Sequence, residues 1–181
     1  ILSKSLDDRI GLYVLLETIK KINKKSLKCN LYVSASVQEE MGLRGARIIN
    51  SNVNPDFSIA LEGTVSNDLP GVPAHKKLAQ LGNGPEIRIS DKYLIADRSF
   101  NNYLQDTANK KKINFQLTAK NAGGTNATAF QVTGKGSKAT VLSVPVRYLH
   151  SPSSVCLIKD VASTIKLLTA GILNIQKFKD E

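Results

Sequence analysis

The sequence predicts one layered α/β domain, in which helices flank a sheet that is largely parallel or mixed. Its 181 residues suit a single domain that buries a core of its own. Helix-like and strand-like patterns alternate along most of the chain. The last segment, residues 155–175, repeats Val, Ile and Leu at steps of three and four. That spacing predicts a long helix lying across the sheet.

The first part of the chain predicts two helices and two strands. Apolar residues at steps of three and four from Leu12 to Ile22 indicate an amphipathic helix. It begins within LDDRIG and ends in KKINKK, whose lysines suit the negative end of a helix dipole. LYVSASV, residues 31–37, alternates like a strand. A short helix over residues 42–51 and a strand over PDFSIALE, residues 55–62, follow.

A loop rich in Pro and Gly, residues 68–85, separates these elements from the next ones. Beyond the loop we predict a short strand from Ile87 to Ile89, a helix over 97–110, strands over 113–119 and 139–145, and a helix over 126–134 between those strands. In such a sheet, functional groups gather where the carboxyl ends of the strands open into loops.

The net charge could suit a nucleic-acid partner, but the distribution of the charge does not. The chain has 25 basic and 15 acidic side chains, a net charge of +10. Its lysines lie in short groups, KKINKK and NKKK, and no aromatic stripe accompanies them as a stacking surface. Such groups are typical of solvated helix ends, so we expect no nucleic-acid partner.

Neither the cysteines nor the hydropathy pattern indicates a secreted or membrane protein. Cys29 and Cys156 lie far apart and have no metal-knuckle or disulfide-framework spacing. No run approaches the roughly 18 apolar residues of a membrane span. The start, ILSKSLDDRIG, lacks the apolar core of a signal peptide. We expect a cytoplasmic protein with both thiols reduced and no membrane partner.

The polar groups at the strand ends and in their loops are mostly acidic. Several like charges in one cleft would have to take up protons to survive desolvation, whereas a divalent cation would balance them. Carboxylates with one imidazole suit zinc, cobalt or manganese and metal-assisted hydrolysis. Each residue taken singly also fits an ordinary surface or capping role. The groups are Asp7, Asp8, Glu39, Glu40, Glu62, Asp68 and His150.

Adjacent glutamates can divide two roles, because neighbouring side chains on an extended segment point in different directions. One of Glu39 and Glu40 can bind a metal while the other accepts a proton from water. The residues alone therefore predict a metal-dependent hydrolase.

Six stretches from residue 4 to residue 152 resemble the glutamyl and deblocking aminopeptidase family, which includes the tetrahedral aminopeptidases. The resemblance implies a zinc-exopeptidase-like catalytic domain, a peptide substrate and large homo-oligomers of the full-length protein. The stretches are KSLDDRIG, VQEEMGLRGA, PDFSIALEGT with NDLPG, LGNGP, NAGGTNA and VPVRYLHSP.

The same resemblance implies two divalent metal ions and a role for each of five residues. Asp7 would bridge the two ions, Glu40 and His150 would complete one site, and Glu62 would bind the other ion. Glu39 would be the general base. The implied activity is hydrolysis of the amino-terminal residue of a peptide by metal-activated water.

The chain departs from the family pattern in three places. Family members carry a further histidine ligand and an inserted smaller domain before the equivalent of Lys4, and His75 matches no ligand motif. One metal site would therefore lack a histidine, and we expect residues 1–181 to be the carboxyl-terminal part of a catalytic domain. Glu62 stands where many relatives have Asp, and Asn126 in GGTNA stands where GGTDA is common.

Two other functions are also compatible with the sequence. A glycoside hydrolase also uses paired acids, and some members of the family are labelled endoglucanases. Neighbours such as Glu39 and Glu40 are poorly placed to flank one sugar bond, and the chain has no Trp for sugar stacking. An inactive partial domain that binds peptides is the second alternative, because of the missing histidine.

Overall fold

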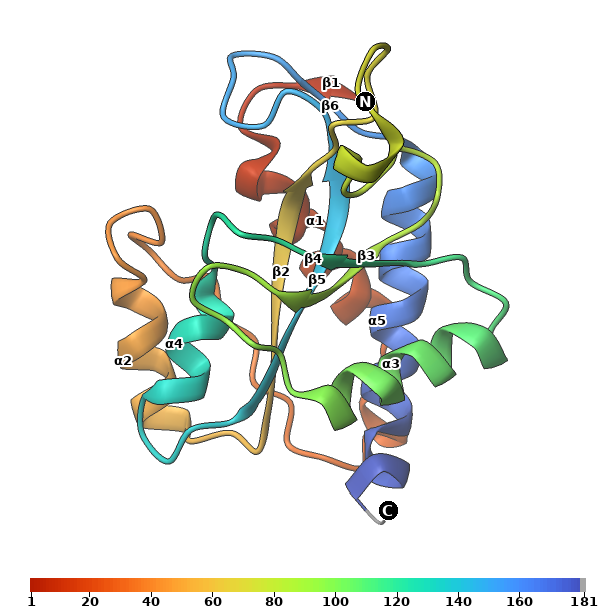
Figure 1. Cartoon of the computed structure of the whole chain (residues 1–181). Coiled ribbons are helices and arrows are strands. Elements are labelled where there is room, and N and C mark those ends of the chain that lie inside the picture. The colour runs from red at the N-terminus through yellow and green to blue at the C-terminus, as the bar shows by residue number, and fades with distance from the viewer. Residues whose placement is uncertain (180–181) are drawn as a thin grey trace.

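The computed structural model describes residues 1–179 as a mixed α/β fold (Figure 1). A four-stranded sheet has the strand order β2-β5-β3-β4. β2 runs parallel to β5, β3 runs antiparallel to β5, and β4 runs parallel to β3, so the expected mixed sheet is confirmed. The strands are β2 (Phe57–Val65), β3 (Glu86–Ser90), β4 (Gln116–Ala119) and β5 (Lys138–Val146).

Helices cover both faces of the sheet, as the layered prediction requires. Figure 1 shows α2 and α4 beside each other on one side of β2 and β5, with α1 and α5 on the other side. The expected helices are all present, with small changes at their ends. Their bounds are α1 (Leu6–Lys21), α2 (Arg44–Val53), α3 (Arg98–Lys110), α4 (Asn126–Val132) and α5 (Ile158–Lys179).

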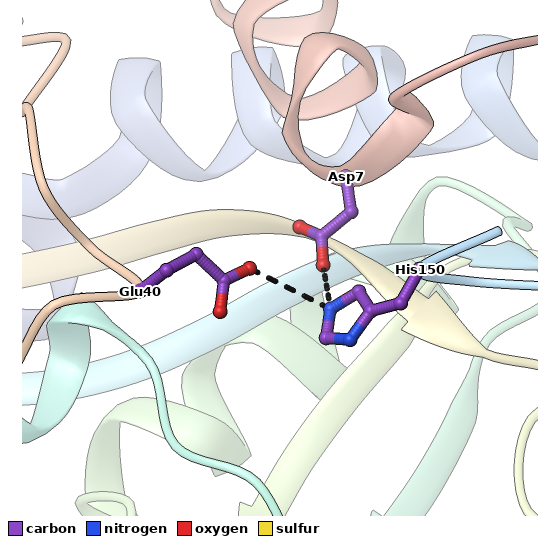
Figure 2. A group of neighbouring side chains, drawn as sticks. All are labelled: Asp7, Glu40 and His150. Carbon is purple, nitrogen blue, oxygen red and sulfur yellow. Dashed lines mark hydrogen bonds and ion pairs between the residues drawn. The ribbon is translucent and has the colours of Figure 1, made fainter. Parts of the chain in front are cut away.

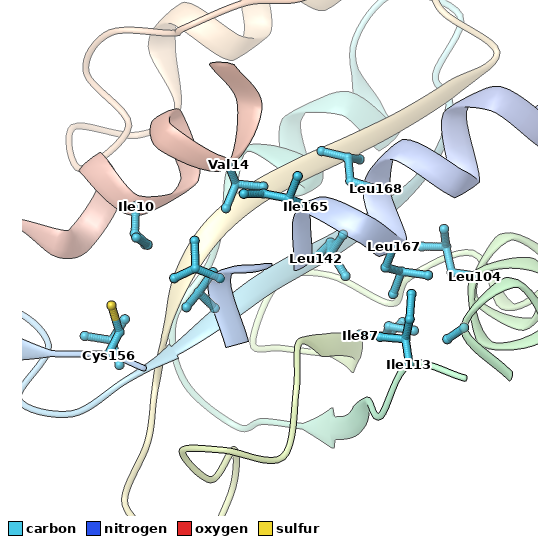
Figure 3. Close-up of a cluster of buried hydrophobic side chains, with 14 of the residues drawn as sticks. Ile10, Val14, Ile87, Leu104, Ile113, Leu142, Cys156, Ile165, Leu167 and Leu168 are labelled. Atoms are coloured by element: carbon cyan, nitrogen blue, oxygen red, sulfur yellow. The ribbon is translucent and has the colours of Figure 1, made fainter. Parts of the chain in front are cut away.

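The central strand β5 divides the core between the two layers, because its side chains alternate between the faces of the sheet. Leu142 and Val144 belong to the larger cluster, which α1, α3 and α5 complete (Figure 3). Ala139 and Val141 belong to the smaller cluster, where Ala127 of α4 packs against them. A strand buried on both faces is typically a near-continuous apolar run, which matches ATVLSVP.

Short elements outside the sheet were not expected from the sequence. β1 (Leu2–Ser3) pairs antiparallel with β6 (Ser154–Val155), so Val155 belongs to a strand and α5 begins three residues later. Single 3₁₀ turns form at η1 (Lys24–Ser26) and η2 (Ala74–Lys76). In the described residues, no helix has the length and apolarity needed to cross a bilayer.

The predicted strand over residues 31–37 is wrong. The segment has neither helical nor strand structure, and Val33 and Val37 expose 43% and 69% of their surface. Its apolar alternation is real, but a strand also needs a hydrogen-bonded neighbour, and none of the described strands lies against it. Glu39 and Glu40 therefore lie in a turn rather than at the end of a strand.

We expect Asp160→Asn to lower the free energy of unfolding by about 1–3 kcal/mol. The buried Asp160 carboxylate accepts hydrogen bonds from the backbone N–H groups of Gly82 and Gly84, at 2.7 and 3.0 Å. An amide retains one acceptor oxygen and turns an NH₂ group toward the other N–H. Urea denaturation would measure the loss. The exposed Asp106→Asn is the matched control, and an equal loss in both variants would contradict this role.

Candidate functional site

Two adjacent aspartates at the start of α1 direct their carboxylates to different places. Asp7 has φ −89° and ψ 109°, and Asp8 has φ −119° and ψ 45°, so neither follows the helical path of the residues after them. Asp7 faces the loop after β5, whereas Asp8 Oδ1 accepts a hydrogen bond from the N–H of Gly11 at 3.0 Å. The Asp7 carboxylate thus reaches a distant segment of the chain, whereas the Asp8 carboxylate bonds to its own helix.

The first group joins three segments that are far apart in sequence. Figure 2 shows Asp7, Glu40 and His150 pointing toward one another. Asp7 Oδ2 lies 2.7 Å from His150 Nε2, and Glu40 Oε1 lies 3.6 Å from the same nitrogen. One ligand atom from each residue lies within 4.8 Å of the others. Two carboxylate oxygens and one imidazole nitrogen at such spacing can hold a metal ion such as zinc.

The second group uses Asp7 again, together with Asp8 and Glu62. One carboxylate oxygen from each lies within 4.8 Å of the others. Glu62 is 7% exposed and follows the apolar part of β2, which places it at the edge of the sheet nearest α1. Asp7 is therefore common to both groups, as a residue placed between two metal ions would be.

The electrostatics of the second group favour a bound cation. Burial raises the pKa of Glu62 well above its usual range, and the charges of Asp8, Glu39 and Asp7 raise it further. Asp8 lines a cavity. Burial of its carboxyl group, together with the Asp7 charge, raises the pKa of Asp8 to about 8. These carboxylates repel one another without a counter-charge. A divalent cation among them would remove that cost, so the residues present fit a metal site.

Glu39 lies half-buried beside the first group. Burial raises the pKa of its carboxyl group, and the Glu40 and Asp7 charges raise it further, while His150 acts in the opposite direction. Its backbone carbonyl accepts from the N–H groups of Gly42 and Leu43 at 3.2 and 3.0 Å, so a tight turn holds it in place. The side chain is therefore positioned next to the candidate ligands without belonging to either three-residue group.

We expect the metal-free chain to lose stability as the pH rises from about 5 to about 8. Folded Asp8 keeps its proton up to a pKa of about 8, whereas an unfolded Asp releases it near pH 4. The folded state thus binds more protons in this window, and the free energy of unfolding falls with pH. The raised pKa of Glu62 acts in the same direction. Thermal melts in chelator and in excess zinc would measure the trend.

Two carboxylates with lowered pKa values, Asp68 and Glu86, do not change the stability between pH 5 and pH 8. Arg147 hydrogen-bonds Asp68 and lowers its pKa to about 2. The charges of Arg88 and Lys120 outweigh the burial of Glu86 and hold its pKa at about 2. Their stabilisation is fully present above pH 4.5 or so and is lost only in acid. A melting temperature that rises from pH 5 to 8 without metal would contradict the prediction, and zinc should flatten the profile.

Two polar residues considered in the sequence lie elsewhere. Asp68 forms a two-pronged ion pair with Arg147, with Nε at 2.6 Å and Nη2 at 3.0 Å, and belongs to neither candidate metal group. His75 lies in η2 and is likewise outside both groups. Asp68 thus holds the loop after β2 instead of contributing to the site.

Asn126, in the GGTNA stretch, supports the site from a distance. It is the first residue of α4, and its Nδ2 donates to Ser36 Oγ at 3.0 Å. Ser36 lies three residues before Glu39, so this bond connects α4 with the segment that carries both glutamates. A neutral amide can donate this bond, whereas a carboxylate could only accept one.

Asp8 is the member of the site that the predicted ligand set left out. An acidic pair at the start of a helix has an ordinary explanation, because it complements the positive end of the helix dipole. The available signal was its position directly after Asp7, in the stretch KSLDDRIG. The contact between Asp8 and Glu62 depends on how α1 packs against β2, which local sequence does not specify.

A comparison with protein families finds one whose model matches most of the chain. Residues 1–167 match the family described as M42 glutamyl aminopeptidase. The glutamyl aminopeptidase of Lactococcus lactis is 33% identical over 179 residues, which cover 99% of this chain and 49% of that protein. A putative aminopeptidase of Acetivibrio thermocellus is 33% identical over 172 residues, covering 95% of this chain and 51% of that protein.

Solved structures of aminopeptidases have the same fold as this chain. A TET aminopeptidase from a marine sediment archaeon of the Thaumarchaeota has a TM-score of 0.92 at 31% identity, over 99% of this chain and 51% of that one. The chain shares the zinc-exopeptidase fold of these enzymes, as the resemblance implied. It spans about half the length of the curated relatives that it matches.

Proposed function

Because the chain belongs to the M42 glutamyl aminopeptidase family of peptidases, we propose that it is part of the catalytic domain of a metal-dependent aminopeptidase. Residues 1–181 would form a partial domain, and the substrate would be a peptide with a free amino terminus. The observation that carries the proposal is that Asp7 is shared between the two candidate ligand groups. A carboxylate with two oxygens is suited to bridging two cations.

Two divalent ions, zinc, cobalt or manganese, would bind at these groups. Glu40 and His150 would hold one ion and Glu62 the other, with Asp7 between them. Asp8 is a further candidate for the second ion, whose group contains no histidine among the described residues. The donor types support the proposal, because hard oxygen ligands with one imidazole suit these metals.

When bound, the metals would acidify water and polarise the carbonyl group of the peptide bond. Glu39 would take the proton from that water and pass it to the leaving amine. Its raised pKa supports this role, because a general base works best when its pKa lies nearer the working pH than that of a free carboxylate. The turn at Gly42 and Leu43 would keep the carboxylate oriented during turnover.

The relatives suggest an assembly, and the cysteines suggest a compartment. The Pyrococcus horikoshii TET1 peptidase, with a TM-score of 0.81 at 32% identity over 94% of this chain and 49% of that one, assembles into a tetrahedron or a large octahedral shell. A homo-oligomer is therefore our proposal for the full-length protein. Cys29 and Cys156 are free thiols, which supports a cytoplasmic location.

A glycoside hydrolase remains the rival enzyme. A Thermotoga maritima structure described as an endoglucanase has a TM-score of 0.76 at 25% identity, over 99% of this chain and 51% of that one. The required pair of acids would have to flank one glycosidic bond at about 5 Å or more. Glu39 and Glu40 are chain neighbours within one turn, so they do not suit that arrangement.

Elemental analysis combined with an aminoacyl-anilide assay tests the proposal. We expect two equivalents of divalent metal per chain, turnover that a chelator abolishes, and recovery when zinc, cobalt or manganese is added back. Release of reducing sugar without release of amino acids would favour the glycosidase. Absence of both metal and turnover would favour a partial peptide-binding domain.

A further inference from the structure

His150 lies in a short loop whose two ends are fastened to each other. The loop follows β5 and runs from Arg147 to Val155. The Arg147 N–H donates to the carbonyl oxygen of Val155 at 2.9 Å, and the Val155 N–H donates to that of Arg147 at 3.1 Å. Because these ends are fixed, the place of His150 depends on how the residues between them fold.

The backbone of this loop is strained at two positions. Tyr148 and His150 both have a φ of 59°, in the left-handed region that L-residues rarely adopt. Leu149, between them, packs against the apolar core, while His150 faces Asp7 (Figure 2). Such backbone conformations persist only where the surrounding contacts over-determine them. The path of this loop therefore needs contacts that hold it.

Three hydrogen bonds to one carbonyl oxygen hold this path. The Tyr148 oxygen accepts from the backbone N–H of Ser151 at 3.3 Å, from Ser151 Oγ at 2.6 Å and from Ser154 Oγ at 2.9 Å. Ser151 Oγ also lies 2.9 Å from the carbonyl oxygen of Ser153, and its single hydrogen can serve only one of the two acceptors. The hydroxyl of Ser154 has no such second acceptor among the described residues.

The burial of Ser154 limits the alternatives of its hydroxyl group. The residue is 1% exposed, so water cannot replace the Tyr148 oxygen as its acceptor. A buried hydroxyl group without a hydrogen bond is costly. The bond from Ser154 should therefore persist, and it fixes the Tyr148 carbonyl relative to β6.

β6 in turn connects the loop with the segment that carries Asp7. Ser154 pairs with Ser3 of β1 in the two-stranded sheet near the top of Figure 1. His150 lies four residues before Ser154, and Asp7 lies four residues after Ser3. The strand pair thus brings two short segments to the same place, where Asp7 Oδ2 and His150 Nε2 are 2.7 Å apart.

We propose that Ser154 is a positioning residue for His150. Its hydroxyl group holds the Tyr148 carbonyl, the carbonyl holds the loop in its left-handed path, and the loop keeps His150 Nε2 beside Asp7. Ser154 belongs to neither candidate ligand group, so it acts through the loop and does not touch the ion. The inference rests on the proposed function, in which His150 holds one ion.

Zinc titration of the full-length protein tests the effect on the ion. In a Glu62→Gln background, only the ion held by His150 should remain. In that background, Ser154→Ala should weaken zinc binding about 10–100-fold, as the loss of a group that orients a metal ligand does. Ser154→Thr keeps the hydroxyl group and should restore the affinity. Ser153→Ala, an exposed neighbour, is the matched control and should leave the affinity unchanged.

A second background separates positioning from general destabilisation. In His150→Ala, the ion near Glu62 is the one that remains, and Ser154→Ala should not change its affinity. Equal losses in the two backgrounds would overturn the proposal. A loss that Ser154→Thr does not restore, although thermal melts show that this variant folds, would overturn it as well.

Crystal structures without metal give a test that does not depend on the ion. The unmodified protein should keep His150 Nε2 near 2.7 Å from Asp7 Oδ2, whereas Ser154→Ala should move the two atoms beyond about 3.5 Å, outside hydrogen-bonding range. A Ser154→Ala structure that keeps this contact would overturn the proposal. If the unmodified protein binds no zinc, the proposed function fails, but this structural result still decides the role of Ser154.

Discussion

Replacing Glu39 with Gln is expected to lower kcat for aminoacyl-anilides by about 10²–10⁴-fold, the usual contribution of a general base. The amide keeps the size of the side chain but cannot accept the proton from water. Glu39 lies outside both candidate ligand groups, so the metal content should not change. Steady-state kinetics with elemental analysis of the same samples would measure both effects. The two readouts together distinguish a lost base from a lost metal.

The matched control is Glu17→Gln, which removes one negative charge as Glu39→Gln does. Glu17 pairs with Lys20 on α1, at 2.7 Å, and lies outside the site. This variant should retain full turnover. Retained peptidase activity in Glu39→Gln would show that another group takes the proton. Loss of metal together with activity would instead make Glu39 a ligand.

Much of the fold could be predicted because local pattern and tertiary environment agree. The run ATVLSVP is apolar at five of its seven positions, and β5 is buried on both faces. The steps of three and four in α5 match the stripe that packs on the sheet, from Val161 to Leu168. In such elements the periodicity of the side chains and the direction of burial carry the same information.

Residues 31–37 show where that agreement ends. Their alternation predicts a strand, but pairing is a property of two segments, and the pattern of one segment does not reveal whether a neighbour is present. A cavity next to β2 gives a physical reason for the difference. Residues 31–36 and β2 both line this cavity, and no described strand lies between them.

The candidate site was partly predictable for a similar reason. Acidic residues at the ends of separate elements indicated one cleft, and the structure brings Asp7, Glu40 and His150 within reach of one ion. The orientation of a single carboxylate was not predictable. Asp8 turns toward Glu62 because the backbone at the start of α1 is not helical, and the sequence shows only two adjacent acids.

Asp7→Asn is expected to weaken metal binding at both sites, whereas variants of the other ligands should affect one site each. Asp7 contributes to both candidate groups, His150 to one and Glu62 to the other. Groups that only orient a metal ligand cost about 10–100-fold in affinity when removed. Loss of a direct ligand should therefore cost at least that much. Zinc titration by calorimetry would give the number of sites and their affinities.

The pattern of losses tests the shared position of Asp7 more sharply than any single variant. His150→Ala should leave one equivalent of zinc bound, and Glu62→Gln should leave the other equivalent. Asp7→Asn should lose both, although Asn can still offer one neutral oxygen. If Asp7→Asn retained one tight site, the two ions would not share this carboxylate. The proposed mechanism would then have to proceed without a bridging ligand, because Asp7 is the residue common to both groups in the described chain.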